Sequence, residues 1–181
     1  RIGYAYPNNP LWNEWATIDG IRHFSEGMGD DNPLFNDPSY GPRTRWGSMI
    51  APPLFYHSMG VNIAPPMPQE IKEQSKGALA GVHMFQGGGE WEWFHPVKVN
   101  DRLLRFATLS DVVEKERSHF SGGRSVISYR LHLYLNDRTN EMVVRQKEWF
   151  VHVEREASRE NREKRSTYKP PFYSDEDIQE I

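Results

Sequence analysis

The first third of the chain carries apolar residues at helical spacing. Over residues 16–28 the apolar side chains recur every three or four positions, at Ile18, Ile21, Phe24 and Met28. This spacing predicts a helix with one apolar face. Thr17 or Asp19 is a suitable residue to cap its start, and Gly29 is a suitable residue to end it.

The next sixty residues alternate between loop-forming and apolar stretches. Residues 29–47 are dense in Asp, Asn, Pro and Gly, which predicts a loop with one short helical turn. Residues 50–59 are apolar nearly all round, and Pro52 and Pro53 fit a helix only in its first turn. We therefore expect a buried helix there. Residues 61–77 predict a lid-like loop with a short helix near Glu70.

Beyond residue 80 the apolar period changes from helical to alternating. Four strands are predicted, over residues 82–93, 103–115, 125–136 and 142–153. In the third strand one face carries Ile127, Tyr129, Leu131, Leu133 and Leu135, and the other carries Ser128, Arg130, His132 and Tyr134. This alternation predicts one covered apolar face and one wet face. Residues 137–140 (Asp-Arg-Thr-Asn) are typical of a hairpin turn.

The simplest assembly of these elements is an antiparallel sheet wrapped around the apolar helix over residues 50–59. This is a single hot-dog fold of the α+β class. We expect the domain to span residues 1–153. Residues 154–181 are rich in alternating charges without an apolar stripe, which predicts a charged tail or solvated helix.

Composition excludes several classes of protein. The formal net charge is −3, which disfavours nucleic acid as a partner, and no apolar run approaches the roughly 20 residues of a membrane helix. The chain has no Cys, which excludes thiolate catalysis and disulfides and fits a reducing cytoplasm. The sequence has no metal-ligand spacing among His23, His57, His83 and His95, so no metal is expected. Six Trp, eight Tyr and nine Phe are compatible with a large contact surface.

Three motifs carry a resemblance to a known family. Residues 29–38 (Gly-Asp-Asp-Asn-Pro-Leu-Phe-Asn-Asp-Pro) resemble the Asp-x-Asn-Pro-Leu-His signature of the MaoC-like (R)-specific enoyl-CoA hydratases. Residues 48–53 (Ser-Met-Ile-Ala-Pro-Pro) stand where the family's central helix begins. Residues 94–101 (Phe-His-Pro-Val-Lys-Val-Asn-Asp) resemble its Pro-Val-x-x-Gly-Asp stretch. The resemblance covers residues 16–153 and is greatest to the N-terminal, dehydratase-like half of paired hot-dog hydratases.

The family's chemistry implies roles for particular residues. In the family an Asp and a His activate water, and a backbone N–H at the start of the central helix polarises the thioester carbonyl. Asp30 matches the catalytic Asp, but Phe35 stands in the place of the His. Pro53 has no N–H and therefore cannot be the oxyanion donor. Two parts of the machinery are missing, which favours a half-site that shapes and holds the substrate.

The resemblance then implies a set of partners and contacts. We expect a hetero-oligomer with a second hot-dog subunit that carries the Asp and His dyad, acting on a trans-2-enoyl-CoA. Coenzyme A would enter only as part of the substrate, without a further cofactor. A bulky acyl group, such as a long chain or a steroid side chain, would suit Phe35. The substrate-binding residues would be Asn32, Phe35, Pro53, His57 and Gly88.

Other interpretations of the same residues stay open. Asp30 can serve only to turn the loop, because Asx side chains often bind nearby backbone N–H groups. His57, on the predicted buried helix, is interpreted first as a hydrogen-bonded core histidine. It is the best replacement base if the chain is active alone, as a homodimeric hydratase or thioesterase that uses Asp30. The triple glycine at residues 87–89 predicts a bulge or a close backbone approach beside the pocket. A non-catalytic acyl-CoA-binding module is the third alternative.

Overall fold

A long five-stranded sheet dominates the computed structural model, which describes residues 1–5, 12–78, 80–116 and 123–154. The strands run in the order β1-β3-β4-β5-β2, so that β2 (Val82–Trp93) lies at one edge. β3 (Leu103–Lys115), β4 (Ser125–Asn136) and β5 (Met142–Glu154) pair antiparallel, and β2 pairs antiparallel with β5. The four expected strands are confirmed. The charged tail expected from residue 154 lies, apart from Glu154 itself, outside the described residues.

A fifth, very short strand lies at the other edge of the sheet. β1 (Val61–Asn62) runs parallel to β3, whereas the sequence predicted only antiparallel neighbours. Two residues are too few to show a period of two, so no alternation in the sequence marks this strand.

The expected turn between β4 and β5 is confirmed. The Asn140 N–H donates to the Asn136 carbonyl at 2.8 Å, and the Asn136 side-chain oxygen accepts from the Arg138 N–H at 3.0 Å. Asn140 has a φ of 59°, a left-handed conformation that Asn tolerates. The turn joins the two strands, and after a register shift between Tyr134 and Leu135 their pairing places Arg130 opposite Glu148.

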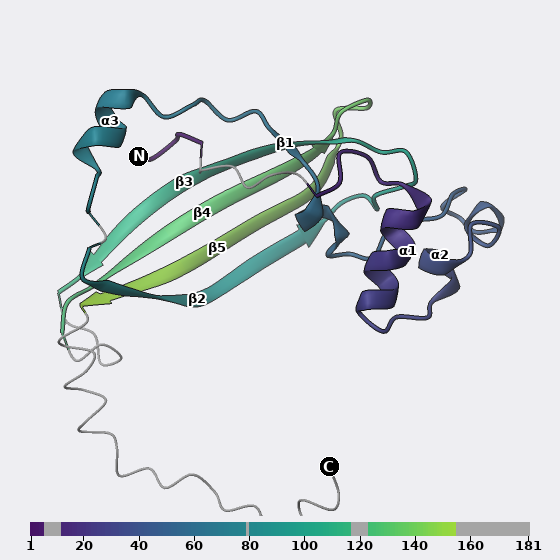
Figure 1. The fold of residues 1–181 in the computed structure, drawn as a ribbon, viewed down its shortest axis with the longest axis horizontal. Coiled ribbons are helices and arrows are strands. Elements are labelled where there is room, and N and C mark those ends of the chain that lie inside the picture. The colour runs from purple at the N-terminus through teal and green to yellow at the C-terminus, as the bar shows by residue number, and fades with distance from the viewer. Residues whose placement is uncertain (6–11, 79, 117–122, 155–181) are drawn as a thin grey trace, which may run out of the picture.

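The first two α-helices of the chain lie beyond one end of the sheet, whereas the third lies toward the opposite end (Figure 1). α1 (Ile18–Gly27) begins after Thr17, whose hydroxyl accepts from the Gly20 N–H at 3.1 Å, and is followed by Gly29 at a φ of 69°. α2 (Pro33–Asn36) and a 3₁₀ turn, η1 (Gly41–Arg43), lie in the expected loop, and α2 contacts α1. α3 (Gln69–Gln74) is the short helix expected near Glu70.

The prediction of a helix over residues 50–59 is wrong. Only a single 3₁₀ turn forms there, η2 (Phe55–Ser58), directly preceded by a turn at residues 53–54. Ile50 bridges to Lys98, and the Ala51 N–H donates to the Val97 carbonyl at 2.8 Å. Consecutive prolines explain the difference: each lacks an N–H, and Pro53 disfavours the helical conformation of the residue before it.

The predicted exposure of the two faces of β4 is also wrong. The polar face is the more buried one, since Ser128, His132 and Tyr134 are at most 7% exposed, whereas the residues between them are only partly buried. η2 contacts this face directly, because the Tyr56 ring packs edge-on against Tyr134 at 4.7 Å between centroids. We call this side the inner face of the sheet.

The hydrophobic core occupies only one end of the inner face. It joins α1, α2 and η2 to the start of β3, the end of β4 and the start of β5, with Ile21, Phe55 and Leu103 fully buried. Farther along the sheet, the first half of β2 and the end of β3 are largely exposed. The sheet therefore extends well beyond the core that this single chain provides.

The triple glycine of β2 forms the expected bulge. The pairing of β2 with β5 shifts between Gln86 and Gly88, and the indole of Trp149 lies over the glycine backbone. A Cβ on Gly88 would meet the Trp149 ring at 2.5 Å, and the φ of Gly88 is 154°. Only glycine allows this close approach.

Candidate functional site

The loop that carries the family-like signature is held by its own side chains. The Asp30 carboxylate accepts from the Asn32 N–H at 3.0 Å, and the Asn32 side chain accepts from the Leu34 N–H at 3.0 Å, which caps α2. Buried Ser25 donates to the Asp30 carbonyl at 2.7 Å, and Asn36 donates to the same carbonyl at 2.8 Å. These bonds fix the loop against α1. Asp30 and Asn32 therefore have a structural role.

Asp30 and Phe35 face different spaces. Asp30 lines an open cavity of about 430 Å³ together with Arg22, Glu26 and Asn36. Phe35 is 8% exposed and belongs to the core. The residue in the place of the family's His therefore does not share a cavity with the residue in the place of its Asp.

Phe35 instead forms one wall of an apolar groove of about 490 Å³. The groove is lined by residues from α2, the loop before residue 54, the end of β2 and the start of β5, among them Phe35, Trp46, Ile50, Pro53, Trp93 and Val144. The Trp93 indole N–H donates to the Pro53 carbonyl at 3.0 Å, which joins two of these walls. Exposed His95 adds a titratable side chain to a lining that is otherwise apolar.

A cation stacks on one of the aromatic residues that line the groove. The Arg45 guanidinium stacks over the ring of Trp46 with 4.3 Å between the guanidinium carbon and the ring centroid. Pro52 and Pro53, which line the groove where the family's central helix would begin, have no N–H to offer a carbonyl oxygen. This groove can hold an apolar group, but these two residues cannot stabilise an oxyanion.

The structure thus divides the predicted substrate-binding residues. Phe35 and Pro53 meet in the groove. His57 is exposed on η2 and stacks on Tyr56 at 4.3 Å between ring centroids. Gly88 lies in the bulge of β2. Sequence reasoning missed Trp46 and His95, because the groove is assembled from segments far apart along the chain.

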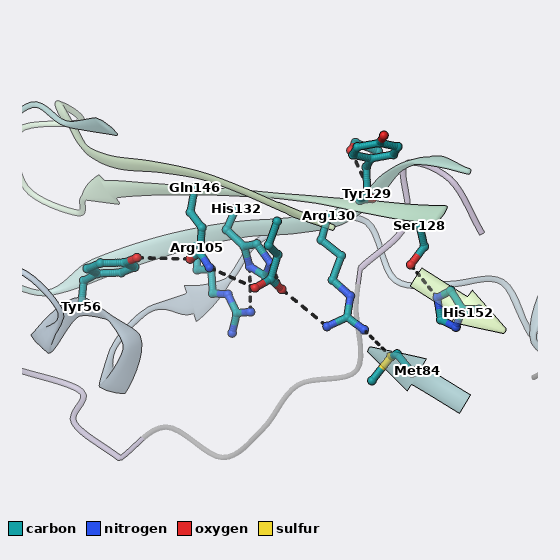
Figure 2. Close-up of polar contacts among 11 residues, drawn as sticks. Tyr56, Met84, Arg105, Ser128, Tyr129, Arg130, His132, Gln146 and His152 are labelled. Atoms are coloured by element: carbon teal, nitrogen blue, oxygen red, sulfur yellow. Dashed lines mark hydrogen bonds and ion pairs between the residues drawn. The ribbon is translucent and has the colours of Figure 1, made fainter. Parts of the chain in front are cut away.

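A polar network on the inner face was also missed (Figure 2). Arg105 donates to His132 Nδ1 at 3.0 Å, and because an arginine can only donate, His132 is left to donate from Nε2 to Glu148 Oε1 at 3.3 Å. From the other side Tyr56 donates to Gln146 at 3.3 Å, and Gln146 donates to Glu148 Oε2 at 3.2 Å. Burial raises the pKa of Tyr56, so its hydroxyl stays protonated.

Arg130 completes this network, which we call the inner-face cluster: Tyr56, Arg105, Arg130, His132, Gln146 and Glu148. The Arg130 guanidinium lies 3.5 Å from Glu148 Oε1 and stacks over the Phe150 ring at 3.9 Å. Burial alone would raise the pKa of Glu148, but contacts with His132 and Arg130 hold it below its ordinary value. Next to the cluster, Ser128 and buried His152 share a hydrogen bond of 2.8 Å.

The signal for this cluster was present in the sequence. The alternation along β4 and β5 already separates two faces. The structure then pairs His132 with Gln146 and Arg130 with Glu148 on one face, after a register shift between Tyr134 and Leu135 that counting back from the turn would miss. Each strand was interpreted by itself, and the face with polar residues was taken to be exposed to solvent. The charged residues that pair across the two strands were therefore not recognised as a buried group.

Comparisons with known proteins place the chain in a family. The model of the family described as FAS1-like, dehydratase domain region matches residues 10–146. A protein of Streptomyces avermitilis named UPF0336 protein is 28% identical over 143 residues, which cover 79% of this chain and 86% of that protein. A UPF0336 protein of Streptomyces griseus is 26% identical over the same shares of both chains.

Solved structures share the fold at low sequence identity. The ChsH1–ChsH2 complex of Mycobacterium tuberculosis matches with a TM-score of 0.61 at 17% identity, over 80% of this chain and 82% of that chain. The MaoC-like dehydratase from Rhodospirillum rubrum gives 0.53 at 18% identity, over 78% and 86%. The HadBC (3R-hydroxyacyl-ACP dehydratase) complex of M. tuberculosis gives 0.51 at 18% identity, over 82% and 93%.

These findings define a hot-dog domain of the dehydratase and hydratase class, and the expected fold is confirmed. The chain belongs to the FAS1-like dehydratase-region family and resembles MaoC-like hydratases in structure. In the described part of the chain no helix is long and apolar enough to cross a membrane. Within the same residues no group of three or more His, Asp or Glu side chains is arranged to hold a metal ion.

Proposed function

We propose that this chain is the substrate-shaping, non-catalytic subunit of a cytoplasmic, hetero-oligomeric hydratase that adds water to trans-2-enoyl-CoA thioesters. The partner would be a second hot-dog subunit with an intact Asp and His dyad, and coenzyme A would take part only as the carrier of the acyl group. The observation that carries this proposal is the separation of Asp30 from Phe35: the former turns a loop, and the latter is a core residue beside an apolar groove.

The chemistry of hydration requires groups that this loop does not supply. Water must lose a proton as its oxygen bonds to the β-carbon, and the resulting enolate oxygen needs a donor before the α-carbon is protonated. Phe35 has no proton to exchange, and Pro53 has no N–H. The partner would therefore supply the base and the oxyanion donor, while this chain supplies apolar wall and binding energy.

The groove suits the acyl part of such a substrate. Its aromatic and aliphatic lining favours a bulky hydrocarbon such as a long chain or a steroid side chain, since apolar pockets bind through buried area. The cation of Arg45 beside the groove is suited to the anionic CoA portion. Neither feature requires a catalytic residue in this chain.

The edge strand β2 is the surface on which we place the partner. Within the described residues β2 pairs on one side only, and Met84, Phe85 and Trp93 are 53, 40 and 49% exposed. A long apolar edge strand is a template for pairing with another chain, and soluble proteins usually cover or charge such an edge. Two of the similar structures, ChsH1–ChsH2 and HadBC, are themselves complexes.

The proposal is tested by purifying the tagged chain gently from its native host and identifying stoichiometric partners by mass spectrometry. We expect a second hot-dog chain with a complete dyad. Phe85→Glu on the edge strand should release this partner, whereas Val112→Glu should retain it, because Val112 is equally exposed (44%) but lies on β3. Recovery of the chain as a clean homo-oligomer would contradict the proposal and favour a homodimeric hydratase, a thioesterase or a binding module.

A further inference from the structure

The apolar groove has a buried floor and an exposed rim. Its floor is formed by lining residues that belong to the core and are at most 7% exposed, such as Ile50, Val97 and Val143. Trp93 and Phe94 also line the groove, but they are 49 and 51% exposed and form its rim. Core packing therefore fixes the depth of the groove, whereas aromatic rings bound it on the side toward solvent.

Trp93 is the rim residue that bridges two walls. It is the last residue of β2, where it pairs with Val144 of β5, and its indole N–H donates to the Pro53 carbonyl at 3.0 Å. Pro53 lies on the segment before η2 and is an exposed part of the same lining. The ring of Phe94 has no polar atom with which to form such a bond. The Trp93 side chain is thus held at both ends, by strand pairing and by the bond to Pro53.

A ring held in this way limits the size of what the groove can enclose. An indole has only two χ angles, so these two constraints leave it little freedom to move aside. An acyl group that fills the groove up to the Trp93 ring buries each added methylene, which strengthens binding by about fourfold. A methylene beyond the ring stays in water and adds little. The affinity for acyl thioesters should therefore rise with acyl size and then level off where the chain meets Trp93.

We infer that Trp93 is the residue that determines acyl specificity, because its ring sets the size limit of the groove. This inference rests on the proposed function and deepens it: the accepted acyl groups are those that end at or before the indole. Trp93 takes no part in the addition of water. Without the indole the groove opens toward the β2 edge, so that larger acyl groups bury more of their apolar surface.

The test is a calorimetric titration of the complex, purified with its partner, against butanoyl-, octanoyl-, dodecanoyl- and hexadecanoyl-CoA. We expect the wild-type affinity to rise along this series and then to level off. In Trp93→Ala the rise should continue for at least one further member. The affinity for the first thioester beyond the wild-type limit, relative to that for the last one within it, should increase at least about tenfold, since four methylenes become buried. Levelling off at the same length in both proteins, or a wild-type affinity that still rises at hexadecanoyl-CoA, would overturn the inference.

A second variant separates the ring from its bond. Trp93→Phe keeps an aromatic side chain but cannot donate to the Pro53 carbonyl, so it should shift the limit in the same direction by less. This variant decides the matter if Trp93→Ala folds poorly or loses the partner. The matched control is Met84→Ala, because Met84 is 53% exposed on the same strand but lies outside the described lining of the groove. An equal shift in Met84→Ala would mean that the edge strand as a whole, and not Trp93, sets the limit.

The remaining outcomes distinguish this inference from the proposed function. If Trp93→Ala weakens all four thioesters by the same factor, Trp93 has only a structural or docking role, and the inference fails while the proposed function stands. If the wild-type complex binds none of the thioesters, both are contradicted. Urea titration of each variant accompanies the binding series, because a general loss of stability would not change the length at which the affinity levels off.

Discussion

Restoring the family's histidine is expected to damage this chain rather than activate it. Phe35 is 8% exposed within the core, and burying a phenylalanine contributes about 1.5–3 kcal/mol. In Phe35→His part of that contribution is lost, and an imidazole nitrogen is buried without a designated partner, which costs about 1–3 kcal/mol. We therefore expect the free energy of unfolding to fall by about 2–4 kcal/mol.

Urea titration followed by tryptophan fluorescence measures this loss. Phe35→Leu is the matched control, because it keeps the wall apolar and should cost less than about 2 kcal/mol. The same variants are assayed for loss of the conjugated enoyl thioester absorbance. No turnover is expected, since the Asp30 carboxylate is bound to the Asn32 N–H and faces another cavity. A Phe35→His chain that is as stable as the wild type and hydrates enoyl-CoA would refute this reasoning.

Two further predictions concern the sheet. Gly88→Ala places a Cβ 2.5 Å from Trp149 and should lower the free energy of unfolding by about 2–4 kcal/mol in urea titration, while Gly27→Ala, with nothing within 4 Å, should not destabilise the chain. Burial, and secondarily Arg130, lowers the pKa of His152 in the folded chain. Acidification from pH 7.5 to 5.5 therefore protonates the unfolded chain first and lowers stability, and His152→Gln should reduce this loss.

Either sheet prediction can fail in a recognisable way. Equal stability of the Gly88→Ala and Gly27→Ala chains would mean that the Trp149 indole does not lie on the glycine backbone in solution. An unchanged dependence of stability on pH in His152→Gln would mean that this imidazole is protonated as readily in the folded chain as in the unfolded chain.

The strands were predictable because the information that defines them is local. Alternation over a dozen residues marks each long strand, and the turn over residues 137–140 joins β4 to β5. The register shift between Tyr134 and Leu135 had no such local signal. The same reasoning failed at Pro52 and Pro53, where the apolar pattern favoured a helix and the missing N–H groups opposed it. At these two residues the lack of backbone N–H groups prevents the helix that the apolar pattern favours.

The inner face could not be predicted because alternation alone does not say which face is covered. Ser128, His132 and Tyr134 look solvent-exposed in one strand, yet η2 and the partners from β3 and β5 bury them. Only part of the groove was predicted: the family resemblance implied that Phe35 and Pro53 bind substrate, but not the other lining residues. Trp46 reaches the groove through tertiary folding of a loop that has no periodic pattern of its own.

The central claim is that this chain holds substrate while another subunit performs the chemistry. The most direct measurement is the rate of water addition to a trans-2-enoyl-CoA, followed by absorbance, for the pure chain and for its complex with the partner. The account predicts turnover only for the complex, retained within about twofold in Asp30→Asn because the amide oxygen can still accept from the Asn32 N–H. Turnover by the pure chain that Asp30→Asn abolishes would contradict it.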